Sequence, residues 1–269
     1  MTNSTVRKYP EFIVTKTYRR FEEFCNACHK EKYIGLCYGP PGVGKTLSAR
    51  YYTKRHIMED QAVISFEHFP DELTTCRSIL ITPSITTTPR LLLSDIGKSE
   101  VHLNYVVSFA QYDLGVPLDQ RKIADYCELI IVDEADRLKT ESIEALREIY
   151  DQRDLGLILI GMPGFEKRLS RYPQLYSRIG FAHHYTTLSN AETQFILETH
   201  GKKLGIEFRF DDFTAKEALA AIIRITQGNF RLINRMLRQI ERILDINDLN
   251  HINKEVVEAA RECLVIGSY

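Results

Sequence analysis

Short apolar runs alternate with segments of helical periodicity through the first two thirds of the chain. The runs are rich in Ile, Leu and Val and almost uninterrupted, which is typical of strands that are covered on both faces of a parallel sheet. We expect five such strands, at 33–38, 78–82, 129–133, 157–161 and 181–185. A further apolar run at 62–66 fits an additional strand within an insertion.

From about Ser189 onward the pattern changes to one helix after another. Ser189 with Glu192, and Thr214 with Glu217, form S/T-x-x-E capping boxes that mark helix starts. Apolar residues then recur at helical spacing, as expected for a packed core face. These residues are Ile233, Met236, Leu237, Ile240 and Ile243, followed by Val256, Val257, Ala260 and Leu264. The sequence therefore predicts an α/β domain with a mostly parallel central sheet at residues 1–188 and a small helical domain at 189–269.

Composition limits the class of protein without deciding it. The 269 residues are 44% hydrophobic and carry 35 basic against 36 acidic side chains, so no overall positive field demands nucleic acid as a partner. The first ten residues are polar, and no apolar run approaches the roughly 20 residues that span a bilayer. We expect a cytoplasmic protein without membrane association, in which the six cysteines are reduced.

The string Cys-Asn-Ala-Cys-His at 25–29 matches the attachment sequence of c-type haem. That modification requires export, and a zinc site would need a second Cys or His pair at finger spacing, which does not follow. Phe21, Phe24, Cys25 and Cys28 share one face of a helical pattern. We therefore interpret the two cysteines as buried helix thiols.

A G-x-x-x-x-G-K-[ST] phosphate loop follows the first predicted strand. It consists of Gly39, Pro40, Pro41, Gly42, Val43, Gly44, Lys45 and Thr46, with a helix expected from Leu47 onward. Glycines let the backbone curl around phosphate with its N–H groups inward, and the helix offers its positive end. Lys45 is expected to face the β- and γ-phosphates, and the Thr46 hydroxyl to ligate Mg²⁺. The predicted cofactors are ATP and Mg²⁺.

Two acids, Asp133 and Glu134, end the aliphatic run at 129–132. Asp133 is the predicted magnesium residue and Glu134 the group that polarises the attacking water. An Asp-Glu pair after a strand can instead cap a helix and interact with its dipole. The phosphate loop upstream favours the catalytic interpretation.

Beyond these motifs, two strings resemble AAA+ ATPases, and among them the DNA-transposition regulators of the MuB, TnsC and TniB type. One is Asp-Glu-Ala-Asp-Arg-Leu at 133–138, and the other is Ile-Gly-Met-Pro-Gly at 160–164, which leads to Arg-Tyr-Pro-Gln-Leu-Tyr-Ser-Arg-Ile-Gly-Phe at 171–181. The similarity extends over 18–266. It implies a P-loop AAA+ domain followed by a helical lid.

The resemblance assigns roles to two arginines. Arg178 occupies the position of an arginine finger, which reaches the ATP of a neighbouring subunit; Arg168 and Arg171 are nearby competitors. Arg231, in Gly-Asn-Phe-Arg at 228–231, resembles the sensor-2 residue that contacts the γ-phosphate. The alternatives are a solvated surface arginine for Arg178 and an ordinary helix-terminal arginine for Arg231.

One position departs from the family pattern. AAA+ proteins usually carry a polar sensor-1 residue at the tip of the strand before the finger, whereas here Gly161 is followed by Met162 and Pro163. No side chain in this segment is able to orient water. We therefore expect slow ATP hydrolysis that suits a switch better than a motor.

The resemblance further implies a homo-oligomer, either a filament or a ring, on duplex DNA with ATP at its subunit interfaces. It would mark target sites and recruit or activate a transposase, and slow hydrolysis would disassemble it. The expected DNA contacts are Thr86, Thr87, Thr88, Arg90 and Lys98, with a second basic patch at 54–56. The residues at 82–90 are equally compatible with a plain loop that ends in a Thr cap.

Two other functions remain open from the sequence. A helicase-loading AAA+ ATPase usually carries extra DNA-reading or helicase-binding segments. An ExeA-like nucleotide-gated switch commonly carries a sensor domain or a transmembrane segment. The sequence contains neither kind of addition, which favours the transposition regulator.

Overall fold

The computed structural model describes residues 12–59, 70–117, 125–203, 213–249 and 251–264. The chain forms two compact units. The larger contains Tyr18–Gly39 and Lys45–His184, and the smaller contains Ile13–Thr17, Pro40–Gly44 and the chain from Tyr185 onward. The sequence pattern does not indicate that Pro40–Gly44 belongs with the smaller unit.

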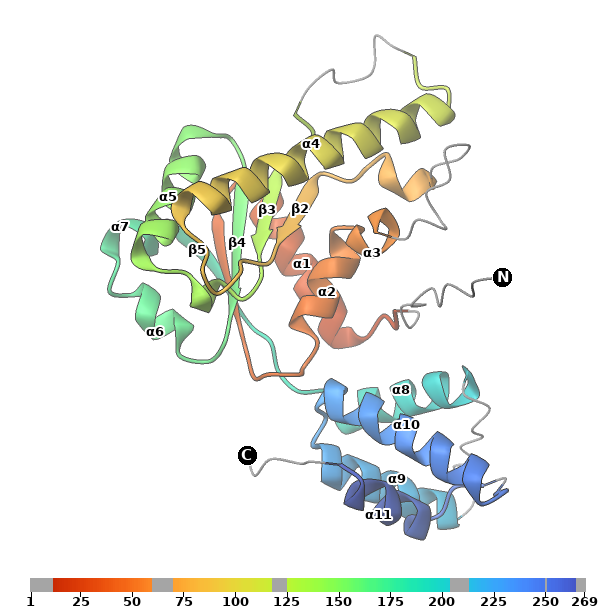
Figure 1. Cartoon of the computed structure of the whole chain (residues 1–269). Helices are drawn as coiled ribbons and strands as arrows, with labels where there is room; N and C mark the ends of the chain where they lie inside the picture. The colour runs from red at the N-terminus through yellow and green to blue at the C-terminus, as the bar shows by residue number, and fades with distance from the viewer. Residues whose placement is uncertain (1–11, 60–69, 118–124, 204–212, 250, 265–269) are drawn as a thin grey trace. The chain divides into compact units, whose positions relative to one another are not determined.

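A five-stranded sheet forms the centre of the larger unit, in the order β2-β3-β4-β1-β5 (Figure 1). The strands are β1 (Ile34–Tyr38), β2 (Ser78–Ile81), β3 (Leu129–Val132), β4 (Gly156–Gly161) and β5 (Ile179–His184). Every neighbouring pair is parallel. The predicted fold class and all five predicted strands are confirmed, with ends that shift by one or two residues. The run at 62–66 lies outside the described residues.

The middle of the sheet explains the continuous apolar runs. All residues of β2, β3 and β4 are buried, because helices cover both faces of the sheet. The described helices of this part of the chain are α1 (Lys16–Glu31), α2 (Lys45–Tyr52), α3 (Arg55–Met58), η1 (Asp71–Leu73), α4 (Pro89–Asp113), η3 (Ala135–Arg137), α5 (Thr140–Gln152), α6 (Phe165–Leu169) and α7 (Pro173–Tyr176). Among the described residues, no helix combines the length and the apolar character that spanning a membrane requires.

The cysteine string at 25–29 lies on α1. Phe21, Phe24, Cys25 and Cys28 are all buried, so the amphipathic face and the buried helix thiols predicted there are confirmed. Burial raises the pKa of the Cys28 thiol to about 12, which keeps it protonated and unreactive. All six cysteines are free.

Four helices make up most of the smaller unit: α8 (Asn190–Lys203), α9 (Phe213–Thr226), α10 (Phe230–Ile246) and α11 (Lys254–Glu262). The predicted apolar stripes form its core. Its buried members include Ile233, Met236, Leu237, Ile240, Val256, Val257 and Ala260, with Ile243 and Leu264 partly buried at its edge. The stripes stabilise the unit because each helix buries one apolar face against the others.

The predicted capping box at Ser189 and Glu192 is confirmed. The Glu192 N–H donates to Ser189 Oγ at 3.2 Å, and the Ser189 N–H donates back to Glu192 Oε2 at 3.1 Å. Glu192 also accepts from the Thr17 N–H at 2.7 Å, which anchors Ile13–Thr17 to this unit. Thr214 lies inside α9, which already includes Phe213, so the helix begins earlier than its sequence signal indicates.

Gly228 joins α9 to α10 in a conformation that only glycine adopts easily. Its φ is +72°, and its carbonyl accepts from the Leu188 N–H at 3.0 Å. A Cβ at this position would lie 2.1 Å from the Leu188 carbonyl oxygen. Both the left-handed backbone and the close approach therefore exclude a side chain.

We predict that Gly228→Ala lowers stability by about 1–3 kcal/mol, because a left-handed residue with a Cβ is strained and the clash is with backbone. The midpoint of thermal unfolding, followed by circular dichroism, measures the effect. Gly97→Ala is the control: Gly97 lies inside α4, and a Cβ added there would have open space within 4 Å. That control should gain about 0.5–1 kcal/mol from helix propensity. Equal shifts for the two variants would contradict the assignment.

Candidate nucleotide-binding site

The carboxyl ends of β3, β4 and β1 lie side by side at one edge of the sheet. β1 leads into the phosphate loop, and β3 leads into Asp133 and Glu134. Ligands of parallel α/β sheets bind at this edge, because the loops that follow the strands converge there. The fold thus brings Lys45, Thr46 and Asp133 together within the larger unit, as the sequence predicts.

The phosphate loop depends on two glycines with left-handed backbones. Gly42 has a φ of +79° and Gly44 a φ of +112°. Side chains at either position would be strained, so the sequence motif is explained by the curl of the backbone. Lys45 begins α2, is 8% exposed and donates from Nζ to the Gly39 carbonyl at 2.5 Å. Its ammonium group therefore lies against the loop.

Within the smaller unit, the start of α10 holds Pro40–Gly44. Asn229 Nδ2 donates to the Pro41 carbonyl at 2.9 Å, and the Arg231 N–H donates to the Gly42 carbonyl at 2.9 Å. Asn229 Oδ1 also caps α10 by accepting from the Leu232 N–H at 3.2 Å. The sequence pattern pointed to Arg231 in this string and not to Asn229, although Asn before a helix is a recognisable N-cap signal.

Asp133 is buried at the end of β3 with an exposed fraction of 2%. Its Oδ1 accepts from the Glu134 N–H at 2.9 Å, whereas its Oδ2 is buried and has no hydrogen-bond partner among the described residues. Burial raises the pKa of Asp133, although the Thr46 hydroxyl, the Glu134 N–H and Lys45 act in the opposite direction. A buried carboxylate oxygen without a partner, close to a hydroxyl, fits a hard cation such as Mg²⁺.

Glu134 adopts a left-handed backbone, with a φ of 53° and a ψ of 35°. Such a conformation is uncommon for a residue with a side chain and tends to occur at functional sites. Its carboxylate forms an ion pair with Arg137, and the two side chains are 39% and 44% exposed. Arg137 is a neighbour of Glu134 to which the sequence assigned no role.

The tip of β4 lacks a polar side chain of its own, as the sequence indicates. Met162 is 37% exposed, and its N–H donates to Asp136 Oδ1 at 3.2 Å. Arg168 donates to the Asp136 carbonyl at 2.7 Å and also to the Leu138 carbonyl. The polar group that contacts this tip therefore comes from the acidic string, and Arg168 holds that string in place.

Arg178 forms a two-pronged pair with Asp151. Its Nε donates to Oδ1 at 2.6 Å and its Nη2 to Oδ2 at 3.0 Å. This hydrogen bonding lowers the pKa of Asp151, which also accepts from Arg147 at 2.5 Å. Arg171 is exposed, and its guanidinium has no ion pair or hydrogen bond with the described part of the chain. Both arginines remain candidates for contact with a neighbouring subunit.

The predicted DNA contacts differ in exposure. Thr86, Thr88, Arg90 and Lys98 are exposed, whereas Thr87 is buried with its hydroxyl 3.0 Å from that of Ser84. The expectation that Thr87 contacts DNA is therefore corrected, because its side chain stabilises the loop. The Thr88 hydroxyl caps α4 by accepting from the Leu91 N–H at 3.3 Å, as the alternative interpretation of this loop expects.

The second predicted patch, at 54–56, carries little uncompensated charge. Lys54 pairs with Glu72 at 3.4 Å, and Arg55 pairs with Glu59 at 2.5 Å. Burial lowers the pKa of His56, which favours its neutral form. These residues do not form a positive surface.

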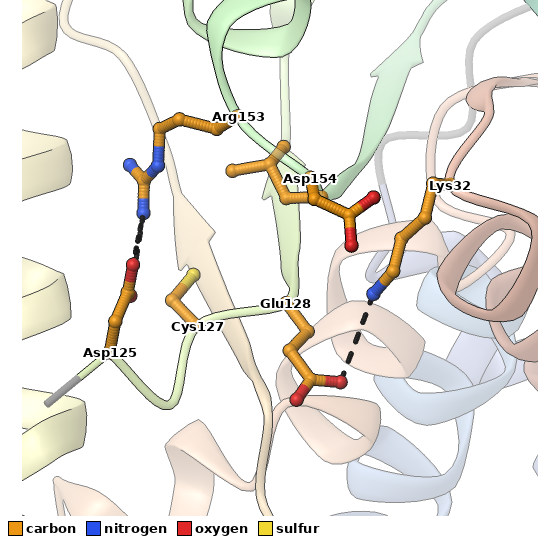
Figure 2. Close-up of a pocket in the computed structure, with 7 residues that line it drawn as sticks. Lys32, Asp125, Cys127, Glu128, Arg153 and Asp154 are labelled. Carbon is orange, nitrogen blue, oxygen red and sulfur yellow. Dashed lines mark hydrogen bonds and ion pairs between the residues drawn. The ribbon is translucent and has the colours of Figure 1, made fainter. Parts of the chain in front are cut away.

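A cavity of about 530 Å³ lies near the amino ends of β3 and β4, at the opposite edge of the sheet. Figure 2 shows the residues that line it. Its lining residues are Lys32, Asp125, Cys127, Glu128, Arg153, Asp154 and Leu155. Both of its cations are paired, Lys32 with Glu128 at 3.8 Å and Arg153 with Asp125 at 3.3 Å. The cavity therefore offers no uncompensated positive charge to a phosphate.

Comparison with known proteins agrees with this geometry. Residues 28–169, more than half of the chain, match the family described as an AAA domain. The chain is 48% identical over 275 residues to a potential ATP-binding protein of Staphylococcus aureus, with 97% of this chain and 98% of that protein covered.

More distant relatives have names that refer to transposition or target DNA. Identity is 27% over 237 residues with the Mu-like prophage FluMu DNA transposition protein B of Haemophilus influenzae, covering 84% of this chain and 71% of that protein. It is also 27% over 180 residues with the ATP-dependent target DNA activator B of Escherichia phage Mu, covering 63% of this chain and 50% of that protein.

Solved structures share the fold. The RuvB Holliday junction branch migration motor of Thermotoga maritima matches with a TM-score of 0.59 and 16% identity, over 94% of this chain and 70% of that chain. The ORC2 protein of Aeropyrum pernix matches with a TM-score of 0.57 and 16% identity, over the same shares. At this identity the likeness shows the fold alone. The family match, the fold and the phosphate loop together identify the chain as a member of the AAA domain family of P-loop ATPases.

Proposed function

We propose that this ATPase regulates DNA transposition by assembling on duplex DNA in its ATP-bound form and recruiting or activating a transposase. The observation that carries the nucleotide chemistry is the buried Oδ2 of Asp133, which lies close to Lys45 and Thr46 and has no hydrogen-bond partner among the described residues. The two relatives at 27% identity support the transposition role, since their names refer to DNA transposition and to target DNA. They give no support to the helicase-loading and ExeA-like alternatives.

In this proposal the phosphate loop, Gly39 to Leu47, binds ATP through its backbone. Lys45 exchanges the Gly39 carbonyl, its present partner at 2.5 Å, for phosphate oxygens. Thr46 and Asp133 would hold Mg²⁺, whose chemistry when bound is to neutralise phosphate charge. The burial of Asp133 keeps water away from the carboxylate and so strengthens its attraction for a cation.

Glu134 would orient and polarise the attacking water, and two observations support slow hydrolysis. Its carboxylate is paired with Arg137, so it must leave this ion pair before it can orient a water molecule. The tip of β4 presents Met162 where a polar group would help position the water. Slow turnover suits an assembly whose lifetime is set by hydrolysis.

The proposed oligomer has ATP at its subunit interfaces. Arg178 would act as the arginine finger on a neighbouring subunit's ATP, and Arg231 would report the nucleotide state through the γ-phosphate. In the single chain Arg178 is held by both oxygens of Asp151. Assembly would therefore replace a carboxylate by a phosphate as the partner of the same guanidinium.

Contacts with DNA are proposed for Thr86, Thr88, Arg90 and Lys98, which are exposed along the start of α4. Hydroxyl and cationic side chains of this kind bind phosphate oxygens and do not read base edges. Binding should accordingly be insensitive to sequence and sensitive to salt.

We predict that Lys45→Ala abolishes ATP binding, whereas Glu134→Gln binds ATP and does not turn it over. Removing Lys45 deletes the cation that faces the phosphates, while Gln keeps the shape of Glu134 and cannot act as a base. Equilibrium binding of a fluorescent ATP analogue and phosphate release measure the two steps. Tight ATP binding by the Lys45 variant, or normal turnover by the Glu134 variant, would contradict the assignment.

We predict that Asn229→Ala weakens ATP binding about three- to tenfold, because it removes a hydrogen bond worth about 0.5–1.5 kcal/mol from the phosphate loop. Asn253→Ala is the matched control. Asn253 caps α11 by accepting from the Val256 N–H at 2.8 Å, as Asn229 caps α10, and it lies 24 positions after Asn229 in the sequence. Both variants should lose about 1 kcal/mol of stability through the lost cap. Only the first should lose ATP affinity, and an equal loss in both would disprove the anchoring role.

The function as a whole is tested by electron microscopy of the protein with random-sequence duplex DNA. We expect filaments or rings on DNA with a slowly hydrolysed ATP analogue, and their absence without nucleotide. Glu134→Gln should form the same assemblies with ATP and retain them. Dispersed protein under all of these conditions would overturn the proposal.

A further inference from the structure

The exposed side of α10 is lined by arginines. Arg231, Arg235, Arg238 and Arg242 follow one another at spacings of four, three and four residues, and all four are exposed. At 3.6 residues per turn they lie within about 60° of one another around the helix axis. The opposite side of α10 is the core face described above, with buried Leu232, Ile233, Met236, Leu237, Ile240 and Leu244. We name these four arginines the arginine face of α10; Figure 1 labels this helix.

These four guanidinium groups have no ion pair or side-chain hydrogen bond with the residues that the structure describes. The two acids of the same helix that lie near them, Glu241 and Asp245, form no ion pair with them either. Other exposed arginines of the smaller unit are compensated: Arg224 pairs with Glu258 at 2.8 Å, and Arg261 pairs with the same carboxylate at 3.4 Å. The arginine face is thus a positive surface without compensation from the described part of the chain.

The arginine face destabilises α10 in the isolated chain, because its like charges repel one another. Like charges at spacings of three or four residues destabilise a helix by about 0.2–0.5 kcal/mol per pair, and the arginine face contains three such pairs in a row. An acidic residue in place of one of these arginines would remove this destabilisation. An extended external polyanion would compensate several of these charges at once.

The extent of the arginine face selects the kind of anion. With a rise of 1.5 Å per residue, Arg231 and Arg242 are separated by about 16 Å along the helix. A single phosphate or carboxylate spans only one or two of these side chains. Each strand of a DNA duplex presents a charge about every 3.4 Å along the axis, so the backbone offers a continuous row of partners. Guanidinium groups bind phosphate oxygens in a two-pronged manner.

We propose that the arginine face of α10 is a DNA-binding surface that takes the phosphate backbone of a duplex through Arg235, Arg238 and Arg242, separate from the contacts at the start of α4. The inference rests on the proposed function, because it assumes that duplex DNA is the polyanion that the protein meets. Charge complementarity carries it, and the surface would bind without regard to base sequence.

The test uses the full chain with a slowly hydrolysed ATP analogue and a fluorescent random-sequence duplex, titrated by anisotropy at several salt concentrations. The variant is Arg235→Gln/Arg238→Gln/Arg242→Gln, which leaves Arg231 intact because that residue is proposed to contact nucleotide. The matched control is Lys216→Gln/Arg224→Gln/Arg261→Gln, which removes three exposed charges from α9 and α11 of the same unit.

We expect the variant to bind DNA at least about tenfold more weakly, with a salt slope that is shallower by up to about 2.7, since each phosphate contact contributes about 0.9. The control should bind as the unchanged protein does. The variant should keep its ATP affinity, and its unfolding midpoint should stay the same or rise, because repulsion is removed. A lower midpoint would assign the arginines a structural role and overturn the inference.

The outcomes separate the two proposals. If the unchanged protein binds duplex DNA and the variant binds it with the same affinity and salt slope, the arginine face of α10 is not a DNA-binding surface, while the proposed function stands. An equal loss in the control would also overturn the inference, because it would reflect net charge alone. If the unchanged protein has no salt-sensitive affinity for duplex DNA, both proposals are overturned.

Discussion

The buried carboxylate of Asp133 is the constraint on which the candidate site depends. A charged group at 2% exposure is costly unless it is paired, and one of its oxygens has no partner among the described residues. The sheet imposes this burial, because Asp133 directly follows a strand that has neighbours on both sides. The described part of the chain thus leaves this oxygen without a partner, and Asp133 would hold a cation there, which would supply positive charge next to the phosphate loop.

α10 combines three tasks in one helix, and its sequence shows how they coexist. Its first turn holds the phosphate loop through Asn229 and the Arg231 N–H, its apolar face builds the core of the smaller unit, and its remaining face is cationic. The apolar face and the cationic face use different residues, and both sets recur at the spacing of a helical turn. If duplex DNA binds the exposed face as proposed, it acts on the helix that anchors the phosphate loop, and DNA and nucleotide would then influence each other's binding.

Much of the fold was predictable because it depends on local patterns. Apolar runs predicted the five strands, and the motif at 39–46 predicted the loop whose glycines have positive φ. The missed features arise from contacts between distant segments. Asn229 and Pro41 are 188 positions apart, and Arg178 and Asp151 are 27 apart. No short-range sequence pattern therefore predicts either contact. The spacing of the arginines on α10 was visible in the sequence, but their lack of partners became visible only in the folded chain. Burial of Thr87 likewise depends on how its loop folds.

Two side chains proposed to act on ATP already have partners within the single chain. Glu134 is paired with Arg137, and Arg178 is held by Asp151, so neither is free for chemistry in the conformation described. Both pairs are partly exposed, and exposed ion pairs are weak, so a bound nucleotide or a neighbouring subunit can replace either partner. Under the proposed function the isolated chain would therefore hydrolyse ATP less readily than the assembly, because Glu134 and Arg178 must each exchange a partner before they can act on ATP.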